Sequence, residues 1–365
     1  MKTLLLIGAG HAHAQVLADW VRAPVAGVQL VVVSPSALAP YSGMVPGWLA
    51  GTYRFEEICI DFAALAAAAG ARLLIDEVQA VDAQARQVRL ASGATLGWDL
   101  LSLNVGSTLV PPAGLPGRVL SLRPLGRLRA AWDEVLAQRA TGAGRIGSVT
   151  AVGGGAAGVE ALLAVLARLR TLQPGQSIGG RLVTRGELLP GLAPGAVRAA
   201  RAALQRAGVQ VHTGTGFEAS QAAPDGLLLW ATGAQAHPWQ RNSGLATSER
   251  GFFRVDQQLR CAGQGQAFAV GDCAEWATPL PKAGVYAVRM GPVLTANLRA
   301  TLAGQPLADY SPQHRFLALL ATADGRAIAA RGRWSLQGRW LGRAAWHWKD
   351  RIDRDFLARF RPPLR

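Results

Sequence analysis

Two segments of the chain share one order of apolar and polar positions. Each begins with a short apolar run, passes through a glycine-rich turn, and continues with apolar residues at helical spacing. They are "TLLLIGAGHAHAQVLADW" near the start of the chain and "VTAVGGGAAGVEALLAVLARLR" near its middle. An unbroken apolar run bounded by glycine is typical of a strand buried on both faces. The pattern therefore predicts strand, tight turn and helix twice in one chain.

The similarity between the two segments extends beyond the glycine turns. A second strand follows each helix ("VQLVVVSPS" and "GRLVTRG"), and a later apolar strand runs into Gly106 or Gly233. Short alternating stretches before each closing strand, of which "RQVRLASGATLGW" is the clearest, predict antiparallel hairpins. The repeated order indicates an internal duplication. We expect an α/β fold with two dinucleotide-binding, Rossmann-like domains.

The glycine turns carry the chemistry that a dinucleotide needs. Glycine lets the backbone approach a pyrophosphate closely, and the N-terminus of the following helix supplies free N–H groups. The middle turn has the complete spacing, with Gly153, Gly155 and Gly158, whereas the first turn has His13 at its third glycine position. For His13 we expect a packing or backbone-positioning role, with a proton relay as the alternative. Two such turns predict two bound dinucleotides.

The residue at the end of the second strand in each unit influences how the ribose of the dinucleotide is bound. An acid at this place hydrogen-bonds the ribose hydroxyls, but the first unit has Ser34 there, whose hydroxyl is a weaker substitute. In the second unit Arg185 follows the strand, which favours the 2′-phosphate of NADPH, although Glu187 stands two residues later. The choice between NADH and NADPH stays open at this point.

Composition and charge restrict the class of protein. The chain has 365 residues, of which 50% are hydrophobic and 17% charged, enough for two or three packed domains. Its net charge of +15 indicates an anionic partner, and among nucleotide, nucleic acid and acidic lipid we expect no nucleic acid. No stretch reaches the roughly 18 apolar residues of a membrane-spanning helix. The three cysteines, at unrelated spacings, predict neither a disulfide framework nor a metal site.

The C-terminal tail concentrates arginine and aromatic residues. Between Arg315 and Arg365 there are 12 Lys or Arg against 4 Asp. At helical spacing one row is formed by Trp348, Ile352, Phe356 and Phe360. The row predicts either a helix packed on the first nucleotide domain or at a homodimer contact, or a helix that binds a membrane surface. The expected location is therefore cytoplasmic, with peripheral attachment to the cytoplasmic membrane face as the second hypothesis.

A third motif gives the layout a family resemblance. The strand in "QAFAVGDCAEW" ends at Gly271 and Asp272, far from both glycine turns. The whole arrangement resembles the pyridine nucleotide–disulfide oxidoreductase superfamily, in which an NAD(P) domain interrupts an FAD domain. The stretches "PYSGMVPGWLAGTY" and "LPKAGVYAVRMGPVLTANL" resemble a subgroup related to type II NADH dehydrogenases, whose members also occur fused ahead of selenide, water dikinase. The resemblance implies FAD at the first turn, NAD(P)H at the second, and Asp272 on the flavin ribitol.

The resemblance also implies domain limits and site residues. The FAD domain is expected at 1–112 and 243–305, the NAD(P) domain at 113–242 and a C-terminal cap at 306–365. Implied FAD contacts are Gly8, Gly10, His11, Ala12, Ser34, Pro35, Ser42, Gly43, Met44, Val78, Val105, Gly106, Gly271, Asp272, Gly284 and Val285. Implied NAD(P)H contacts are Gly153, Gly155, Ala156, Ala157, Gly158, Arg185 and Gly233.

Two residues are expected to act in catalysis. Glu160 faces the nicotinamide pocket in the related enzymes, and its alternative role is to complement the helix dipole. Lys282 lies in a stretch that faces the flavin, where its charge would stabilise the reduced ring, and its alternative is a solvated side chain. No side-chain acid is obligatory for hydride transfer between the two cofactors.

The resemblance implies a flavoprotein that passes a hydride from NAD(P)H to FAD and then electrons to a quinone or another small acceptor. Met290 stands where quinone-reducing relatives tend to carry Gln, which counts against the usual quinone contact. Only Cys59 lies where disulfide reductases have a redox pair, and one thiol cannot form an internal disulfide. Two alternatives remain open: an oxidoreductase of sulfur or selenium compounds at the same FAD site, and a flavin-binding protein without nicotinamide turnover.

Overall fold

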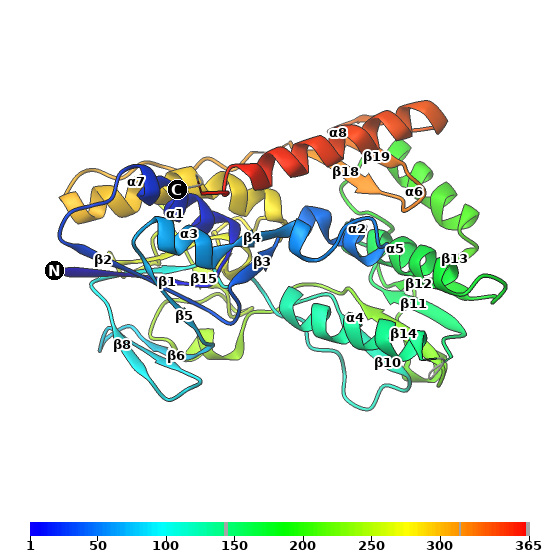
Figure 1. Cartoon of the computed structure of the whole chain (residues 1–365), viewed down its shortest axis with the longest axis horizontal. Helices are drawn as coiled ribbons and strands as arrows, with labels where there is room; N and C mark the ends of the chain where they lie inside the picture. The colour runs from blue at the N-terminus through cyan, green and yellow to red at the C-terminus, as the bar shows by residue number, and fades with distance from the viewer. Residues whose placement is uncertain (142–144, 314, 363–365) are drawn as a thin grey trace.

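The computed structural model describes residues 1–141, 145–313 and 315–362 (Figure 1). Its centre is two parallel sheets of five strands each. The first sheet has the order β16 (Ala267–Ala269), β9 (Leu100–Leu103), β1 (Lys2–Ile7), β2 (Val28–Ser34) and β5 (Arg72–Ile75). The second has the order β10 (Arg118–Ser121), β14 (Gly226–Trp230), β11 (Ser148–Val152), β12 (Gly179–Thr184) and β13 (Val209–Thr213). The α/β fold with two Rossmann-like units is confirmed.

The first sheet is assembled from both sides of the second. Strand β16 follows the whole second sheet in the chain, yet it pairs in parallel with β9, with Ala267 opposite Leu101. The second unit is therefore inserted into the first, as the family resemblance implies. In β1 the residues from Leu4 to Ile7 are at most 1% exposed, because both faces of the sheet are covered. Leu4 and Leu6 pack in a cluster with helix residues such as Trp20, whereas Leu5 and Ile7 pack in a second cluster with residues of the segments 81–98 and 245–274.

Helices flank each sheet, and Figure 1 shows the two groups at opposite ends of the molecule. Beside the first sheet are α1 (His11–Arg22), α3 (Phe62–Ala68) and α7 (Gly284–Ala303). Beside the second are α4 (Leu125–Ala140), α5 (Ala156–Leu172) and α6 (Pro194–Arg206). An excursion from the first unit, with β3 (Leu38–Pro40), η1 (Ser42–Met44), α2 (Val45–Leu49), η2 (Glu56–Ile58) and β4 (Cys59–Asp61), brings α2 against α5.

The two units differ in the segment before their closing strand. In the first unit an antiparallel sheet is formed by β6 (Val78–Asp82), β7 (Gln87–Leu90) and β8 (Thr95–Gly97), so this predicted hairpin is confirmed. In the second unit the prediction is wrong, because the chain between β13 and β14 forms only the short helix η3 (Ala219–Gln221). This connection is too short for a three-stranded meander, and its alternation of polar and apolar residues does not lead to pairing.

The C-terminal region forms a cap over both units. An antiparallel sheet of β18 (Leu317–Ala321), β19 (Ala327–Arg331) and β20 (Trp334–Leu336) is followed by α8 (Arg339–Ala358). Figure 1 shows α8 running along one side of the molecule, from the inserted unit towards the first unit. The remaining short elements are η4 (Pro238–Asn242), β15 (Phe253–Arg254), η5 (Gly271–Cys273) and β17 (Ala274–Glu275).

Candidate functional site

The first glycine turn is built around Asn104, the residue after β9. The Asn104 side chain accepts a hydrogen bond from the Ala12 N–H at 3.2 Å and donates to the Val270 carbonyl at 2.9 Å. A Cβ added at Gly10 would lie only 2.0 Å from Asn104 Oδ1. The amide therefore joins the start of α1 to the ends of β9 and β16. Sequence reasoning missed this residue, although a polar residue directly after a buried strand was a usable signal.

His13 explains why the first turn lacks its third glycine. Its ring is fully buried, with Nδ1 2.6 Å from the Gly8 carbonyl oxygen and Nε2 2.8 Å from the Ser102 hydroxyl on β9. Burial lowers its pKa to about 4. The imidazole thus fills the helix–strand contact with a hydrogen-bonded neutral ring, and the expected backbone-positioning role is confirmed.

Asp272 lies in η5 at the end of β16, where Arg123 reaches it. The Arg123 guanidinium binds both the Asp272 carboxylate and the Ser107 hydroxyl. It also donates to the Lys282 carbonyl at 3.3 Å. Arg123 follows β10, so a residue at the entrance to the inserted unit orients the predicted ribitol ligand. No sequence pattern around Arg123 indicated its contact with Asp272.

A second group of predicted FAD residues faces the same turn. A Cβ added at Gly284, the first residue of α7, would lie 2.8 Å from the Ser42 hydroxyl and 3.9 Å from the His11 ring. The His11 ring packs edge-on against Tyr41, with centroids 5.3 Å apart. Burial lowers the pKa of His11 to about 4, although the Asp272 charge opposes this. The structure therefore brings together the turn at Gly8–Ala12, η1, η5 and the start of α7.

The other predicted FAD residues lie around this group. Met44 is buried in η1, Val285 follows Gly284, and Pro35 follows Ser34, whose hydroxyl donates to the Ser36 carbonyl at 2.8 Å. Val105 and Gly106 follow Asn104, and Gly106 has φ +68° with open space where a Cβ would stand. Val78 lies at the start of β6. Their contacts with a flavin stay predictions.

The second glycine turn has a different internal packing. A Cβ at Gly153 would meet the Ala231 carbonyl oxygen at 2.3 Å, and one at Gly158 would meet the Gly153 carbonyl oxygen at 2.3 Å. A Cβ at Gly155 would meet nothing within 4 Å, and Ala156 and Ala157 are exposed at the start of α5. Gly153 and Gly158 are therefore required by backbone packing, whereas Gly155 leaves open space beside the free N–H groups at the start of α5. Open space also surrounds Gly233.

Glu160, on the first turns of α5, faces the C-terminal cap. Its carboxylate accepts a hydrogen bond from the Ala321 N–H at 2.8 Å, at the end of β18. Burial raises the pKa of Glu160 to about 7, while the positive charge of Lys349 on α8 opposes the shift. Glu160 is thus a partly buried carboxyl group that gains or loses a proton near neutral pH, and its contact with nicotinamide stays a prediction.

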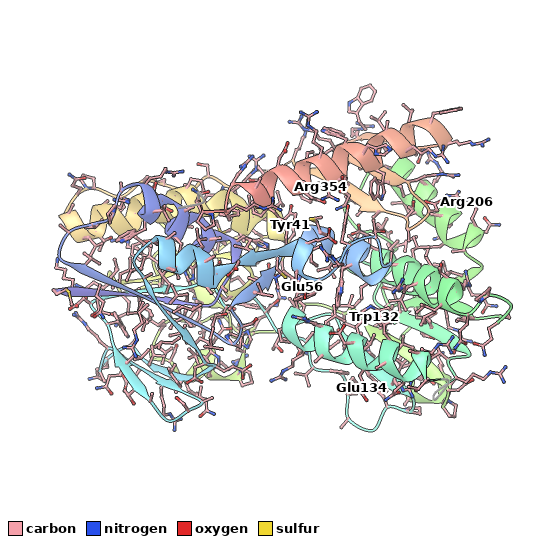
Figure 2. All side chains as sticks on the ribbon, in the orientation of Figure 1. Tyr41, Glu56, Trp132, Glu134, Arg206 and Arg354 are labelled. Carbon is pink, nitrogen blue, oxygen red and sulfur yellow. The ribbon has the colours of Figure 1, made fainter. Side chains whose placement is uncertain are left out.

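Lys349 anchors α8 to the FAD-side excursion. Its Nζ donates to the Gly43 carbonyl and binds the Asp353 carboxylate at 2.6 Å, and both side chains are almost fully buried. Burial raises the pKa of Asp353, and Lys349 opposes the rise. Phe356 on the same helix stacks on Tyr41 at 4.6 Å between centroids, and Figure 2 shows Tyr41 close to α8. Lys349 is one of three lysines in the chain, and this rarity was a usable signal in the sequence, as it was for Lys282.

Lys282 has partners that compete with a role at the flavin. Its Nζ donates to the Ala274 carbonyl at 2.6 Å and lies 3.8 Å from the centre of the Phe252 ring. Burial lowers its pKa, and Glu275 is the main opposing charge. Arg185 is exposed directly after β12 and packs beside Gly216. Neither predicted role is tested by these contacts.

The sulfur-containing residues are engaged in packing. All three cysteines are free thiols, and burial raises the pKa of Cys59 to about 12 and that of Cys273 to about 11. A thiol with a raised pKa is a poor nucleophile at neutral pH. Met290 is 1% exposed, and its sulfur accepts the Gly271 N–H at 3.2 Å. It therefore supports the strand end at Asp272.

The tail row is divided between two environments. Trp348 and Ile352 are 46% and 38% exposed, whereas Phe356 and Phe360 are 7% and 4% exposed. The prediction of one common face is wrong because a spacing of four residues advances about 40° beyond one turn at each step. Two of the acids turn inward: Asp353 binds Lys349, and Asp350 accepts from Tyr53 at 2.5 Å. Within the described residues, no helix has the length and apolar character needed to cross a membrane.

The arrangement fits two dinucleotides. The N-cap residues of α1 and α5 are glycines, and neither helix has an acid in its first turn. Apart from the Ala12 N–H that Asn104 accepts, their N-terminal N–H groups can therefore meet phosphate oxygens. Both helices begin at the carboxyl ends of parallel strands, where α/β sheets bind ligands. The Asp272 carboxylate is a suitable acceptor for ribitol hydroxyls. The donor set thus matches FAD at the first turn and NAD(P)H at the second.

Comparison with known proteins gives one family. The family described as pyridine nucleotide-disulphide oxidoreductase matches residues 2–291. A demethylphylloquinone reductase of Synechocystis is 28% identical over 303 residues, which cover 76% of this chain and 73% of that protein. An NADH dehydrogenase-like protein of Mycobacterium tuberculosis is 28% identical over 229 residues, or 56% of each chain. The structure of the sulfide:quinone oxidoreductase of Aquifex aeolicus aligns with a TM-score of 0.78 at 16% identity, over 99% of this chain and 92% of that one.

Proposed function

The chain belongs to the pyridine nucleotide-disulphide oxidoreductase family, and from this we propose that it passes electrons from NAD(P)H through FAD to a quinone or another small acceptor. It is an FAD-dependent NAD(P)H oxidoreductase. When bound, FAD accepts a hydride from the nicotinamide and hands two electrons to the acceptor. The observation that carries the proposal is the pair of helix starts, α1 and α5, each with glycine at the N-cap and no acid in the first turn, at the ends of two parallel sheets.

The chain's own residues have distinct tasks in this proposal. Asn104 fixes the first turn, and Arg123 orients the Asp272 carboxylate towards the ribitol. The open space at Gly155 admits the nicotinamide pyrophosphate. The cap covers the seam between the units through Glu160 and Lys349, and thereby limits the access of water. Glu160 holds a proton near neutral pH and is a candidate donor to an acceptor that takes up protons with its electrons.

Quinone is the favoured acceptor because one relative is named as a demethylphylloquinone reductase. A quinone cannot contact Met290 as it would contact a Gln at this position, because the Met290 sulfur already accepts the Gly271 N–H. The alternative acceptor, a sulfur or selenium compound, would have to react without a thiol relay, because the cysteines are packed with raised pKa values. A link to selenide, water dikinase rests on the resemblance alone.

Anaerobic mixing of the FAD-loaded protein with NADH or NADPH tests the proposal. Loss of the flavin's visible absorption is expected, followed by its return on addition of a naphthoquinone. Reoxidation by a persulfide in preference to the quinone would support the sulfur alternative. An absorption that neither nucleotide changes would leave a flavin-binding protein without nicotinamide turnover.

A peripheral membrane contact through α8 is the second part of the proposal. Trp340 and Trp348 are 78% and 46% exposed, beside exposed Arg339 and Arg343. Exposed Trp with Arg suits the headgroup region of an anionic membrane. Asp350 and Asp353 bind Tyr53 and Lys349, so these two carboxylates do not face an anionic membrane.

Sedimentation with anionic vesicles at low salt tests the contact. Truncation within α8 would remove Lys349 and Phe356, so Trp340→Ser with Trp348→Ser is the better variant. Ile75→Ser, at a position 57% exposed elsewhere, is the matched control. Loss of sedimentation in the double variant alone is expected. The face is instead a homodimer contact if the wild type and the double variant both fail to sediment, and if light scattering gives twice the monomer mass for the wild type and the monomer mass for the double variant.

A further inference from the structure

The nucleotide end of the inserted unit lacks the acid that selects NADH. In such domains a carboxylate at the end of the second strand binds the ribose 2′-hydroxyl. Here β12 ends at Thr184, and Arg185 comes next. The first carboxylate, Glu187, lies in the loop beyond. The strand end therefore offers a hydroxyl and a guanidinium where NADH binding would use an acid.

A cavity of about 450 Å³ opens beside this strand end. Thr213, which lines it, is the register partner of Thr184 on the neighbouring strand β13. Leu189, which also lines it, donates its N–H to the Gly154 carbonyl at 2.7 Å. Through these two lining residues the cavity adjoins the end of β12 and the second glycine turn.

Two arginines of α6 supply the charge of the cavity. Arg198 and Arg201 line it and are three residues apart, so they share one face of the helix. No carboxylate of the described residues forms an ion pair with either guanidinium, whereas Arg206 on the same helix is paired with Asp324 at 3.8 Å. Glu187 is the one acidic residue in the lining. The cavity therefore has a net positive charge.

We propose that this cavity binds the 2′-phosphate of NADPH, with Arg198 and Arg201 as its ligands, so that the enzyme prefers NADPH to NADH. The proposal rests on the proposed function, because it names the nucleotide that the second glycine turn receives. A phosphate monoester carries nearly two negative charges at neutral pH, and guanidinium groups bind it through paired, charge-assisted hydrogen bonds. Arg185, beside the strand end, adds to the same positive field.

Calorimetric binding of 2′,5′-ADP and 5′-AMP to the FAD-loaded full chain tests the site without turnover. The wild type is expected to bind 2′,5′-ADP more tightly, and Arg198→Ala or Arg201→Ala to weaken that binding roughly ten- to a hundredfold, as for loss of a charge-assisted bond. Binding of 5′-AMP should stay unchanged in both variants. Arg206→Ala is the matched control, since Figure 2 shows Arg206 on α6 at the outer side of the molecule.

The outcomes separate this proposal from the proposed function. Equal affinity of the wild type for the two nucleotides, or equal losses in the Arg198 and Arg206 variants, would overturn the NADPH site. Flavin reduction at a higher kcat/KM with NADPH than with NADH, and loss of that preference in Arg201→Ala, would support it. Tight binding of 2′,5′-ADP without flavin reduction by NADPH would leave the nucleotide site intact and reject the proposed function.

Discussion

Arg123 and Asp272 form an ion pair although 149 residues separate them. The first lies at the entrance to the inserted unit, and the second lies where the chain has returned to the first sheet. Their contact means that the carboxylate expected to bind the flavin ribitol is oriented by the segment that joins the two units. Flavin retention and the seating of the inserted unit are therefore coupled through one pair of side chains.

Replacement of Asp272 by Ala should weaken FAD retention. The change removes the acceptor for ribitol hydroxyls and leaves the Arg123 guanidinium without its carboxylate. The FAD-to-protein ratio after gel filtration measures the effect. Asp19→Ala breaks the ion pair with Arg299 at 2.7 Å, near the C-terminal end of α1 and away from the glycine turn, and should retain its FAD. A yellow, fully loaded Asp272→Ala protein contradicts the assignment.

Gly155→Val should abolish nicotinamide binding while FAD stays bound. Gly155 has φ −74° and ψ 173°, which any residue adopts, and a Cβ there meets no protein atom. The added side chain occupies only the space assigned to the pyrophosphate, so the fold is expected to tolerate it. Flavin content and flavin reduction by NAD(P)H are measured together. A variant that lost FAD and still responded to NAD(P)H would show that the two turns have the opposite assignments.

Gly153→Ala is the contrasting substitution. Gly153 has φ +125°, and a Cβ would lie 2.3 Å from the Ala231 carbonyl oxygen. We expect this variant to lose stability, in contrast to Gly155→Val, and urea unfolding of the two proteins compares them. Similar midpoints for both variants would mean that Gly153 has no structural role.

Lys349→Met should destabilise the protein by about 3–5 kcal/mol, because it leaves the buried Asp353 carboxylate uncompensated. The double variant Lys349→Met with Asp353→Leu should recover part of the loss, since both charges are then removed. Lys2→Met, at an exposed site, is the control. Urea unfolding measures all three, and a double variant less stable than the single one would argue against the buried pair.

The stability of the protein should fall as the pH decreases from about 6.5 towards 4. The pKa of His13 is 6.5 in an unfolded chain and about 4 in the fold, so the unfolded state binds the additional proton in this window. His13→Gln should show a shallower fall than the wild type, whereas exposed His347→Gln should not. Equal slopes for all three proteins would mean that the buried ring does not resist protonation.

Glu160 should change the stability with pH in the opposite direction to His13. Its pKa rises from 4.5 to about 7 in the fold, so the native state binds the additional proton between these values. Stability contributed by the protonated group is then lost as the pH rises through this window. Glu160→Gln mimics the neutral form. The free energy of unfolding of this variant minus that of the wild type should therefore be larger at pH 8 than at pH 5. A difference between the two proteins that does not change with pH would refute the raised pKa.

The two Rossmann-like units and their order could be predicted from the sequence. Strand, glycine turn and helix are set by residues that are close together in the chain, because backbone approach at Gly153 and burial of the apolar run at Leu4–Ile7 are local requirements. The insertion was implied by the family resemblance of the strand before Asp272, and the pairing of β16 with β9 shows it. Patterns of this kind can be predicted from the sequence because they depend on residues that are close together in the chain.

Tertiary structure alone decided how the site is completed. The contacts of Arg123 with Asp272, Lys349 with Gly43, and Glu160 with Ala321 join segments that no periodicity relates. The tail helix shows the same limit, because its spacing gave a row of apolar residues but not which of them would be covered. Exposure depends on what packs against a helix, and that partner is supplied by remote parts of the chain.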